Sequence, residues 1–328
     1  MYKVPVSAVS PNFSLELRDI QDFVAELGPF NGQYAIKYPR NWVQEFLKHI
    51  EQLQPVERHA AKTLIERVNL SLIDTHLTYN ASLDWVSNIQ QNLIKAEYQT
   101  IVGDALDPSP FKSWVEALPD IRESKVRTWK FSGTWSDYFS AIEPLLLISP
   151  AAYIVDRYFD PCDQNAESII TSILDKIKGS RCYELHIITR PSRFNRKFHE
   201  QNNSVMNEFT TVSFNSACDK MNEIFKSRIT KDRKLMFHFV KEDRPGGAFL
   251  RMHNRYFLTK HGAIDFGQGF EIQSQSVPQM DAYIVDKEHH KNLCMTYIDG
   301  VARHREKIPK RQGIAYPIEV FSHRVSLN

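Results

Sequence analysis

Long hydrophobic runs are scarce in this sequence of 328 residues. The most apolar stretch, residues 144–155, is interrupted by Pro150 and is shorter than the roughly 20 residues that a membrane-spanning helix requires. Residues 1–19 contain neither a basic start nor an apolar segment of signal-peptide length. These absences predict a protein that is not secreted and has no transmembrane segment.

Cysteine and net charge are also low. The chain has four cysteines, and no two are close enough in sequence to form a CxxC pair. The simplest interpretation is a reduced, cytoplasmic protein. A formal net charge of +2 excludes a strongly polybasic protein, although local basic segments begin at Arg190, Lys226 and Arg303.

Metal and cofactor motifs are missing as well. Gly267 and Gly269 are too few for a dinucleotide-binding loop, and they follow a hairpin pattern rather than a strand-to-helix turn. His290 and Cys294 stand four apart on a predicted helix, but no third and fourth ligand has recognisable spacing. We therefore expect neither a bound metal nor a cofactor.

The first third of the chain has a helical hydrophobic period. Residues 41–54, 55–77 and 81–102 each carry apolar residues at the spacing of one helix face. Residues 103–120 contain prolines and acidic residues that are typical of a connector. These patterns predict a helical bundle with its connector over residues 1–120, and we expect its helices to bind a protein partner.

After the connector, strand patterns alternate with helical patterns. Strands are predicted at 125–131, 151–156, 183–190, 234–240, 248–259, 262–270 and from 281, and helices at 136–147, 166–178, 216–229 and up to 306. This alternation predicts an α/β layer domain with a partly parallel sheet over residues 121–328.

Polar residues follow three of these predicted strands, at the position where ligands of α/β sheets collect. They are Asp156, then Thr189, Arg190 and Arg193, then His253 and Arg255. On a strand, His253 and Arg255 point to one face, and the arginine's planar fork of donors suits a phosphate. The structural alternatives are a hydrogen-bonding histidine, a turn aspartate and a solvated basic loop.

The spacing of His253, Arg255, Lys260, Gly267 and Gln268 resembles the phospholipase D superfamily signature, although three of the five residues differ. The stretches "SDYFSAI", "IVDRY", "HIIT" and "HNRYFLTKHGAIDFGQGF", within residues 132–272, resemble more closely the phospholipase D-like C-terminal domain of MIT-domain proteins. The resemblance implies a single-lobed, degenerate phospholipase D-like fold that binds ligands rather than cleaving them.

Catalysis in the resembled superfamily needs two histidines, contributed by two lobes or two chains. One His-x-Arg for each chain meets that requirement only in a symmetric homodimer, with His253 as the catalytic residue. Lys260 stands where active members have the aspartate that orients an imidazole. The expected phosphate-binding residues are His253, Arg255, Lys260, Asp156, Thr189, Arg190, Arg193 and Gly267.

Three functions stay open from the sequence. The first is a non-catalytic subunit that binds a phosphate-bearing ligand, nucleic acid in particular, together with a protein partner. Modules of this kind are similar to accessory or sensor subunits of prokaryotic antiphage defence complexes. The second is a dimeric phosphodiesterase or nuclease that uses His253. The third is a peripheral membrane module that binds phosphoinositide headgroups.

Overall fold

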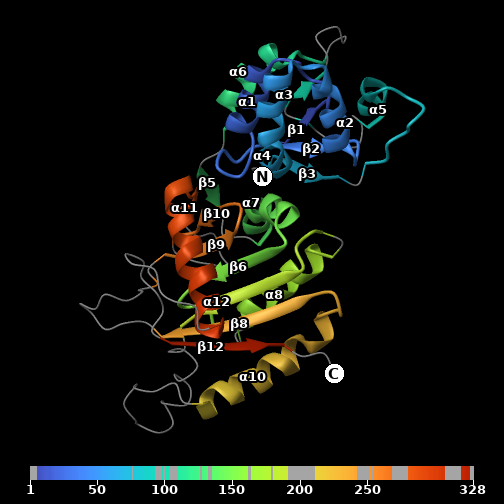
Figure 1. The fold of residues 1–328 in the computed structure, drawn as a ribbon. Helices are drawn as coiled ribbons and strands as arrows, with labels where there is room; N and C mark the ends of the chain where they lie inside the picture. The colour runs from blue at the N-terminus through green and yellow to red at the C-terminus, as the bar shows by residue number, and fades with distance from the viewer. Residues whose placement is uncertain are drawn as a thin grey trace. The chain divides into compact units, whose positions relative to one another are not determined.

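Two mixed α/β units make up the chain, Met1–Arg127 and Thr128–Asn328 (Figure 1). The computed structural model describes residues 6–75, 77–92, 98, 100–103, 110–125, 128–131, 135–161, 164–178, 180–190, 211–241, 252, 254–267, 280–306 and 319–325. The boundary expected after residue 120 falls inside helix α6 (Trp114–Glu123).

The N-terminal unit is built around a parallel sheet. Its strands are β1 (Val6–Val9), β2 (Tyr34–Lys37), β3 (Leu72–Asp74) and β4 (Ile101–Val102), in the order β3-β2-β1-β4. The helices between and after them are α1 (Leu17–Glu26), α2 (Trp42–His49), the short 3-10 helix η1 (Ile50–Gln52), α3 (Pro55–Thr63), α4 (Ile65–Leu70), α5 (Trp85–Asn92) and α6.

The prediction of a helical bundle over residues 1–120 is therefore wrong. Helices α2, α3, α4 and α5 lie within the three segments that were expected to be helical, but β3 and β4 occupy the ends of two of them. The four strands are only two to four residues long. Strands this short give no period-2 signal, and buried parallel strands read as apolar runs that merge with the neighbouring helices.

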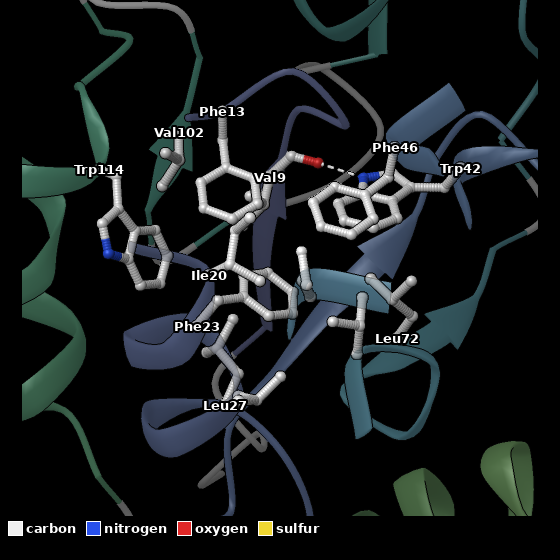
Figure 2. Close-up of a cluster of buried hydrophobic side chains, with 14 of the residues drawn as sticks. Val9, Phe13, Ile20, Phe23, Leu27, Trp42, Phe46, Leu72, Val102 and Trp114 are labelled. Atoms are coloured by element: carbon white, nitrogen blue, oxygen red, sulfur yellow. Dashed lines mark hydrogen bonds between the residues drawn. The ribbon is translucent and has the colours of Figure 1, made fainter. Parts of the chain in front are cut away.

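Aromatic side chains fill one face of this sheet. Phe13, Phe23, Trp42, Phe46 and Trp114 are all buried, and their rings lie 5.2–6.2 Å apart in successive pairs. Figure 2 shows the indole Nε1 of Trp42 donating a hydrogen bond to the carbonyl oxygen of Val9, at 2.7 Å. Helix α2 is thereby attached to the end of β1 by a polar contact inside an apolar core.

The buried carboxylate of Glu26 connects helices α1 and α6 of the N-terminal unit. Glu26, at the end of α1, accepts a hydrogen bond of 2.9 Å from Arg122 Nε on α6 and is paired with Lys125. Burial raises the pKa of Glu26, but the contacts with Lys125 and Arg122 outweigh it, so the net pKa lies below the ordinary value of 4.5. The ionised carboxylate is therefore the stabilising form.

We expect Glu26→Gln to lower the free energy of unfolding by about 1 kcal/mol at pH 7, since Arg122 is half exposed and solvent weakens the pair. A lowered pKa stabilises the fold above the unfolded value near 4.5, and this stabilisation is lost as the pH falls through the folded value. Chemical denaturation at pH 7 and pH 3 measures the difference, which should shrink at pH 3. An equal difference at both pH values would contradict the assignment.

The C-terminal unit contains the larger sheet. Its strands are β5 (Thr128–Phe131), β6 (Ala151–Val155), β7 (Glu184–Thr189), β8 (Lys234–Lys241), β9 (Tyr256–Thr259), β10 (Ala263–Asp265), β11 (Met280–Ile284) and β12 (Glu319–Arg324). Its helices are α7 (Trp135–Ile148), α8 (Gln164–Lys176), α10 (Thr211–Phe225), the short η3 (Lys226–Arg228), α11 (Lys287–Leu293), the π-helical turn η4 (Cys294–Ile298) and α12 (Asp299–Glu306).

The sheet order is β12-β8-β7-β6-β9-β10-β11-β5. Strands β6, β7 and β8 are parallel, and every other neighbour is antiparallel. The mixed α/β architecture with a partly parallel sheet is confirmed. Strand β12 was not predicted, because its sequence "EVFSHR" has no clear alternation of apolar and polar residues.

Helices cover both faces of this sheet. Leu293, Tyr297 and Val301 of the α11–α12 segment pack with Val155 and Tyr256 on one face, which Figure 1 shows in orange and red against the strands. On the other face, Phe214 and Phe225 of α10 contact Phe239 and Phe237 of β8. Among the described residues, no helix is long and apolar enough to cross a membrane.

Candidate functional site

The strand register brings Arg255 next to Asp156. Val155 at the end of β6 pairs with Tyr256 at the start of the antiparallel strand β9. Asp156 follows Val155 and Arg255 precedes Tyr256, so Asp156 and Arg255 are neighbours. Arg255 Nε lies 3.5 Å from Asp156 Oδ1. Because β6 and β7 are parallel, this point is the carboxyl edge of the parallel strands, where ligands of such sheets bind.

Three contacts hold the Arg255 side chain. Nη1 donates a hydrogen bond of 3.0 Å to the carbonyl oxygen of Gly267, Nε faces Asp156, and the guanidinium lies 5.0 Å from the centre of the Tyr158 ring. The Arg255 side chain is 16% exposed. Gly267 has a φ of +51°, which glycine adopts at little cost, and this turn aims its carbonyl oxygen at the arginine.

The Arg255 guanidinium has N–H donors that these contacts do not use. A guanidinium has five N–H groups. One on Nη1 donates to Gly267, whereas Nε is within ion-pair distance of Asp156 but makes no hydrogen bond among the described residues. In the part of the chain that the structure describes, no hydrogen bond from Nη2 is present. A fixed guanidinium with a remaining pair of donors is suited to bind a phosphate oxygen.

Asp156 and Thr189 position the turn after β6. Asp156 is 4% exposed, and its Oδ1 accepts a hydrogen bond of 2.8 Å from the backbone N–H of Tyr158. Thr189 Oγ1, fully buried at the end of β7, donates to the carbonyl oxygen of Phe159 at 2.7 Å. Because the Thr189 hydroxyl donates its hydrogen to Phe159, we assign Thr189 a positioning role.

The surroundings of Arg255 are mixed in charge. The guanidinium of Arg157 lies 5.1 Å from the centre of the Tyr158 ring, and Arg190 directly follows β7. Asp265 accepts hydrogen bonds from Gly267 N at 2.8 Å and from Asn254 Nδ2 at 2.9 Å. Since carboxylates accompany the arginines, recognition of an anion here depends on the geometry of Arg255 more than on a uniformly basic surface.

Asn254 and Arg255 directly precede β9 and contact different neighbours. Asn254 contacts Asp265, whereas Arg255 contacts Asp156. Two other residues that the sequence placed at the site, His253 and Arg193, lie outside the described residues. Their place at this edge stays a prediction.

Lys260 was expected among the phosphate-binding residues, and the structure corrects this expectation. It is exposed and follows the last residue of β9, whereas Arg255 precedes the first. Five residues of extended chain span roughly 17 Å. Lys260 therefore lies at the opposite edge of the sheet, because the motif spacing that grouped it with His253 and Arg255 follows the sequence and not the strand geometry.

His290 and Cys294 meet, but they form a structural contact. Cys294 Sγ lies 3.3 Å from His290 Nε2, and Nε2 lies 2.9 Å from the carbonyl oxygen of Thr259. A carbonyl only accepts, so Nε2 carries the hydrogen and cannot bind a metal. Burial raises the pKa of the Cys294 thiol to about 12, with Asp299 adding to the rise, so the thiolate that metals prefer is disfavoured.

Among the described residues, no group of three or more histidine, cysteine, aspartate or glutamate side chains is placed to bind a metal. The chain matches no protein-family model and no curated protein. The arguments for function therefore come from the residues themselves.

Sequence reasoning missed Tyr158, Asp265 and Asn254 as members of this edge. Tyr158 stood inside the stretch "IVDRY" that was compared with other proteins, and its position two residues after a strand end was the available signal. Asp265 and Asn254 meet only because β9 and β10 form a hairpin with Tyr256 opposite Asp265. The spacing of these residues in the sequence does not predict that pairing.

Proposed function

We propose that the C-terminal unit binds a phosphate-bearing ligand through Arg255, with nucleic acid as the ligand, and that it does not cleave this ligand. The observation that carries the proposal is the fixed Arg255 guanidinium at the carboxyl edge, with Asp156 and Gly267 holding one side of it. The resemblance to phospholipase D-like binding modules agrees with this function. It also supports a role as an accessory or sensor subunit of a prokaryotic defence complex.

Tyr158 favours nucleic acid among phosphate-bearing ligands. Its side chain is 39% exposed, and it lies beside the guanidiniums of Arg157 and Arg255. Aromatic rings next to arginines are the combination that stacks bases and neutralises phosphates in proteins that bind single strands. A lipid headgroup would use the arginines alone.

The absence of hydrolysis is proposed from the residues that replace the signature. Arginine stands at position 255 and lysine at position 260, where the active superfamily has lysine and aspartate. A guanidinium does not give up a proton under ordinary conditions, so Arg255 can hold a phosphate but cannot act as a general acid.

A binding panel tests the function. The full chain is titrated with a fluorescent single-stranded oligonucleotide, and separately with vesicles that contain a phosphoinositide. We expect binding to the oligonucleotide that weakens as salt rises, with a slope of roughly −0.7 in log–log form for each neutralised phosphate. Binding to the vesicles alone, or to neither probe, would contradict the proposal.

A further inference from the structure

A line of polar side chains crosses the middle of the larger sheet. Glu184 Oε2 on β7 lies 3.2 Å from His186 Nε2, and His186 Nδ1 lies 2.9 Å from His238 Nε2 on β8. His238 Nδ1 lies 2.8 Å from Ser322 Oγ on β12. The two imidazoles are 8% and 1% exposed, and their rings are nearly parallel, with an interplanar angle of 9° and ring centres 5.2 Å apart. Neither histidine is part of the Arg255 site.

The hydrogen positions along this line follow from Glu184. The hydrogen bond with His186 and the contact with Lys234, whose Nζ is 2.5 Å from Oε1, together lower the pKa of Glu184 to about 2, against the opposing effect of burial. An ionised carboxylate only accepts, so His186 Nε2 carries a hydrogen. In neutral rings, His186 Nδ1 then accepts from His238 Nε2, and His238 Nδ1 accepts from the Ser322 hydroxyl. Every group is satisfied with both rings neutral.

We propose that Glu184, His186, His238 and Ser322 form a relay that takes up one proton with all its contacts kept, and that a second proton releases the edge strand β12. On uptake, His186 Nδ1 gains the hydrogen that His238 Nε2 loses, and His238 Nδ1 gains a hydrogen supplied by solvent through Ser322. The His186 Nδ1–H and His238 Nδ1–H bonds form, the His238 Nε2–H bond and one O–H bond of a solvent hydronium break, and Ser322 exchanges its hydrogen, so the net gain is one N–H bond. The positive charge then rests on His186, beside the Glu184 carboxylate.

A second proton does not fit this geometry. It would place a hydrogen on both His186 Nδ1 and His238 Nε2, which are only 2.9 Å apart, and two cations beside one carboxylate. The second uptake therefore requires His238 to move away from His186. Since His238 also contacts Ser322, this movement loosens β12, and β12 is an edge strand that pairs with β8 alone.

Tyr153 and charged side chains of both signs surround the relay. Tyr153 on β6 stacks on His186 with ring centres 4.4 Å apart, and Lys234 precedes His238 on β8. Glu184, Lys234 and Arg324 lie on the same strands as the relay, and Asp299 and Arg303 lie on α12, the helix that packs against β12. On the far face, His323 contacts Asn222 at 3.0 Å. Burial lowers the pKa of His323, and Asp219 opposes this.

Spectra of the full chain labelled with ¹⁵N-histidine test the relay directly, because long-range ¹H–¹⁵N couplings report the tautomer of each ring. At pH 7.5 we expect His186 and His238 both to carry their hydrogen on Nε2. As the pH is lowered from 7.5, the pair should take up its first proton together, as one event seen at both rings. An Nδ1–H tautomer at His186, or two independent full titrations, would overturn the proposal.

Hydrogen exchange tests the link to β12. After correction for the intrinsic rate, the amides of residues 319–324 should keep their protection while the pair takes up one proton. They should exchange at least about tenfold faster at the lower pH where a second proton enters, while those of β7 should change less. His238→Gln should remove this acceleration, because glutamine takes up no proton. His323→Gln on the same strand is the matched control and should retain it. If His238→Gln does not fold, the tautomer spectra of the wild-type chain test the proposal without this variant. If a folded His238→Gln shows the same acceleration as the wild type, the proposal is overturned.

Discussion

Replacing Arg255 by alanine is expected to weaken binding of a single-stranded oligonucleotide by about 10- to 150-fold. A hydrogen bond to a charged group contributes about 1.5–3 kcal/mol, and each 1.4 kcal/mol is a factor of ten in affinity. The slope of affinity against salt should also decrease by about 0.7, since one phosphate contact is lost. Fluorescence anisotropy over a series of salt concentrations measures both quantities.

Two further variants separate binding from folding. Arg255→Ala removes the guanidinium beside Asp156, which is 4% exposed, so the stability of this variant must be measured in parallel. Arg255→Lys keeps a positive charge but loses the planar fork, and we expect it to restore stability more than affinity. Lys260→Ala removes the same charge at the opposite end of β9 and should leave affinity within about twofold. An equal loss for Lys260→Ala would show that net charge, and not the Arg255 geometry, binds the ligand.

Replacing Trp42 by alanine is expected to destabilise the N-terminal unit by about 3–5 kcal/mol, the range for removing a buried aromatic side chain. Trp42 is fully buried and stacks on Phe23 and Phe46 with ring centres 5.9 and 5.2 Å away (Figure 2). The variant would also remove the donor to the carbonyl oxygen of Val9. Hydrogen exchange of peptides from residues 6–75, as a function of denaturant, follows this unit separately from the other.

Val56 provides the control for Trp42. It lies on α3 with 82% of its surface exposed, so Val56→Ala should change stability by less than about 0.5 kcal/mol. Trp42→Phe retains most of the apolar volume but loses the hydrogen bond, and we expect an intermediate cost. A loss in Trp42→Ala below about 1 kcal/mol would contradict the role of this residue in the core.

The C-terminal unit was more predictable from sequence than the N-terminal unit. Strands such as "AAYIV" and "ELHIIT" are long enough to stand out from the helices α7 and α8 that flank them. The strand "LID" follows α4 almost directly, so its apolar residues extended a helical pattern instead. A sheet made of such short strands is specified by tertiary contacts, which a single sequence does not display.

The candidate site was predicted in part. Asp156 and Arg255 were expected at strand ends near one edge, and they lie 3.5 Å apart between their closest charged atoms. Lys260 was included through motif spacing and lies at the other edge. The His186–His238 contact joins residues 52 apart in sequence, and its only sequence signal was a histidine within each of two otherwise apolar strands.

The central claim is that Arg255 binds phosphodiesters that the protein does not cleave. A labelled single-stranded oligonucleotide is incubated with an excess of the full chain, and the bound fraction is recovered and sized. We expect an intact oligonucleotide in the bound fraction of the wild type and a much smaller bound fraction for Arg255→Ala. Shortened products that disappear in His253→Ala would contradict the claim, because they would show that the site hydrolyses its ligand.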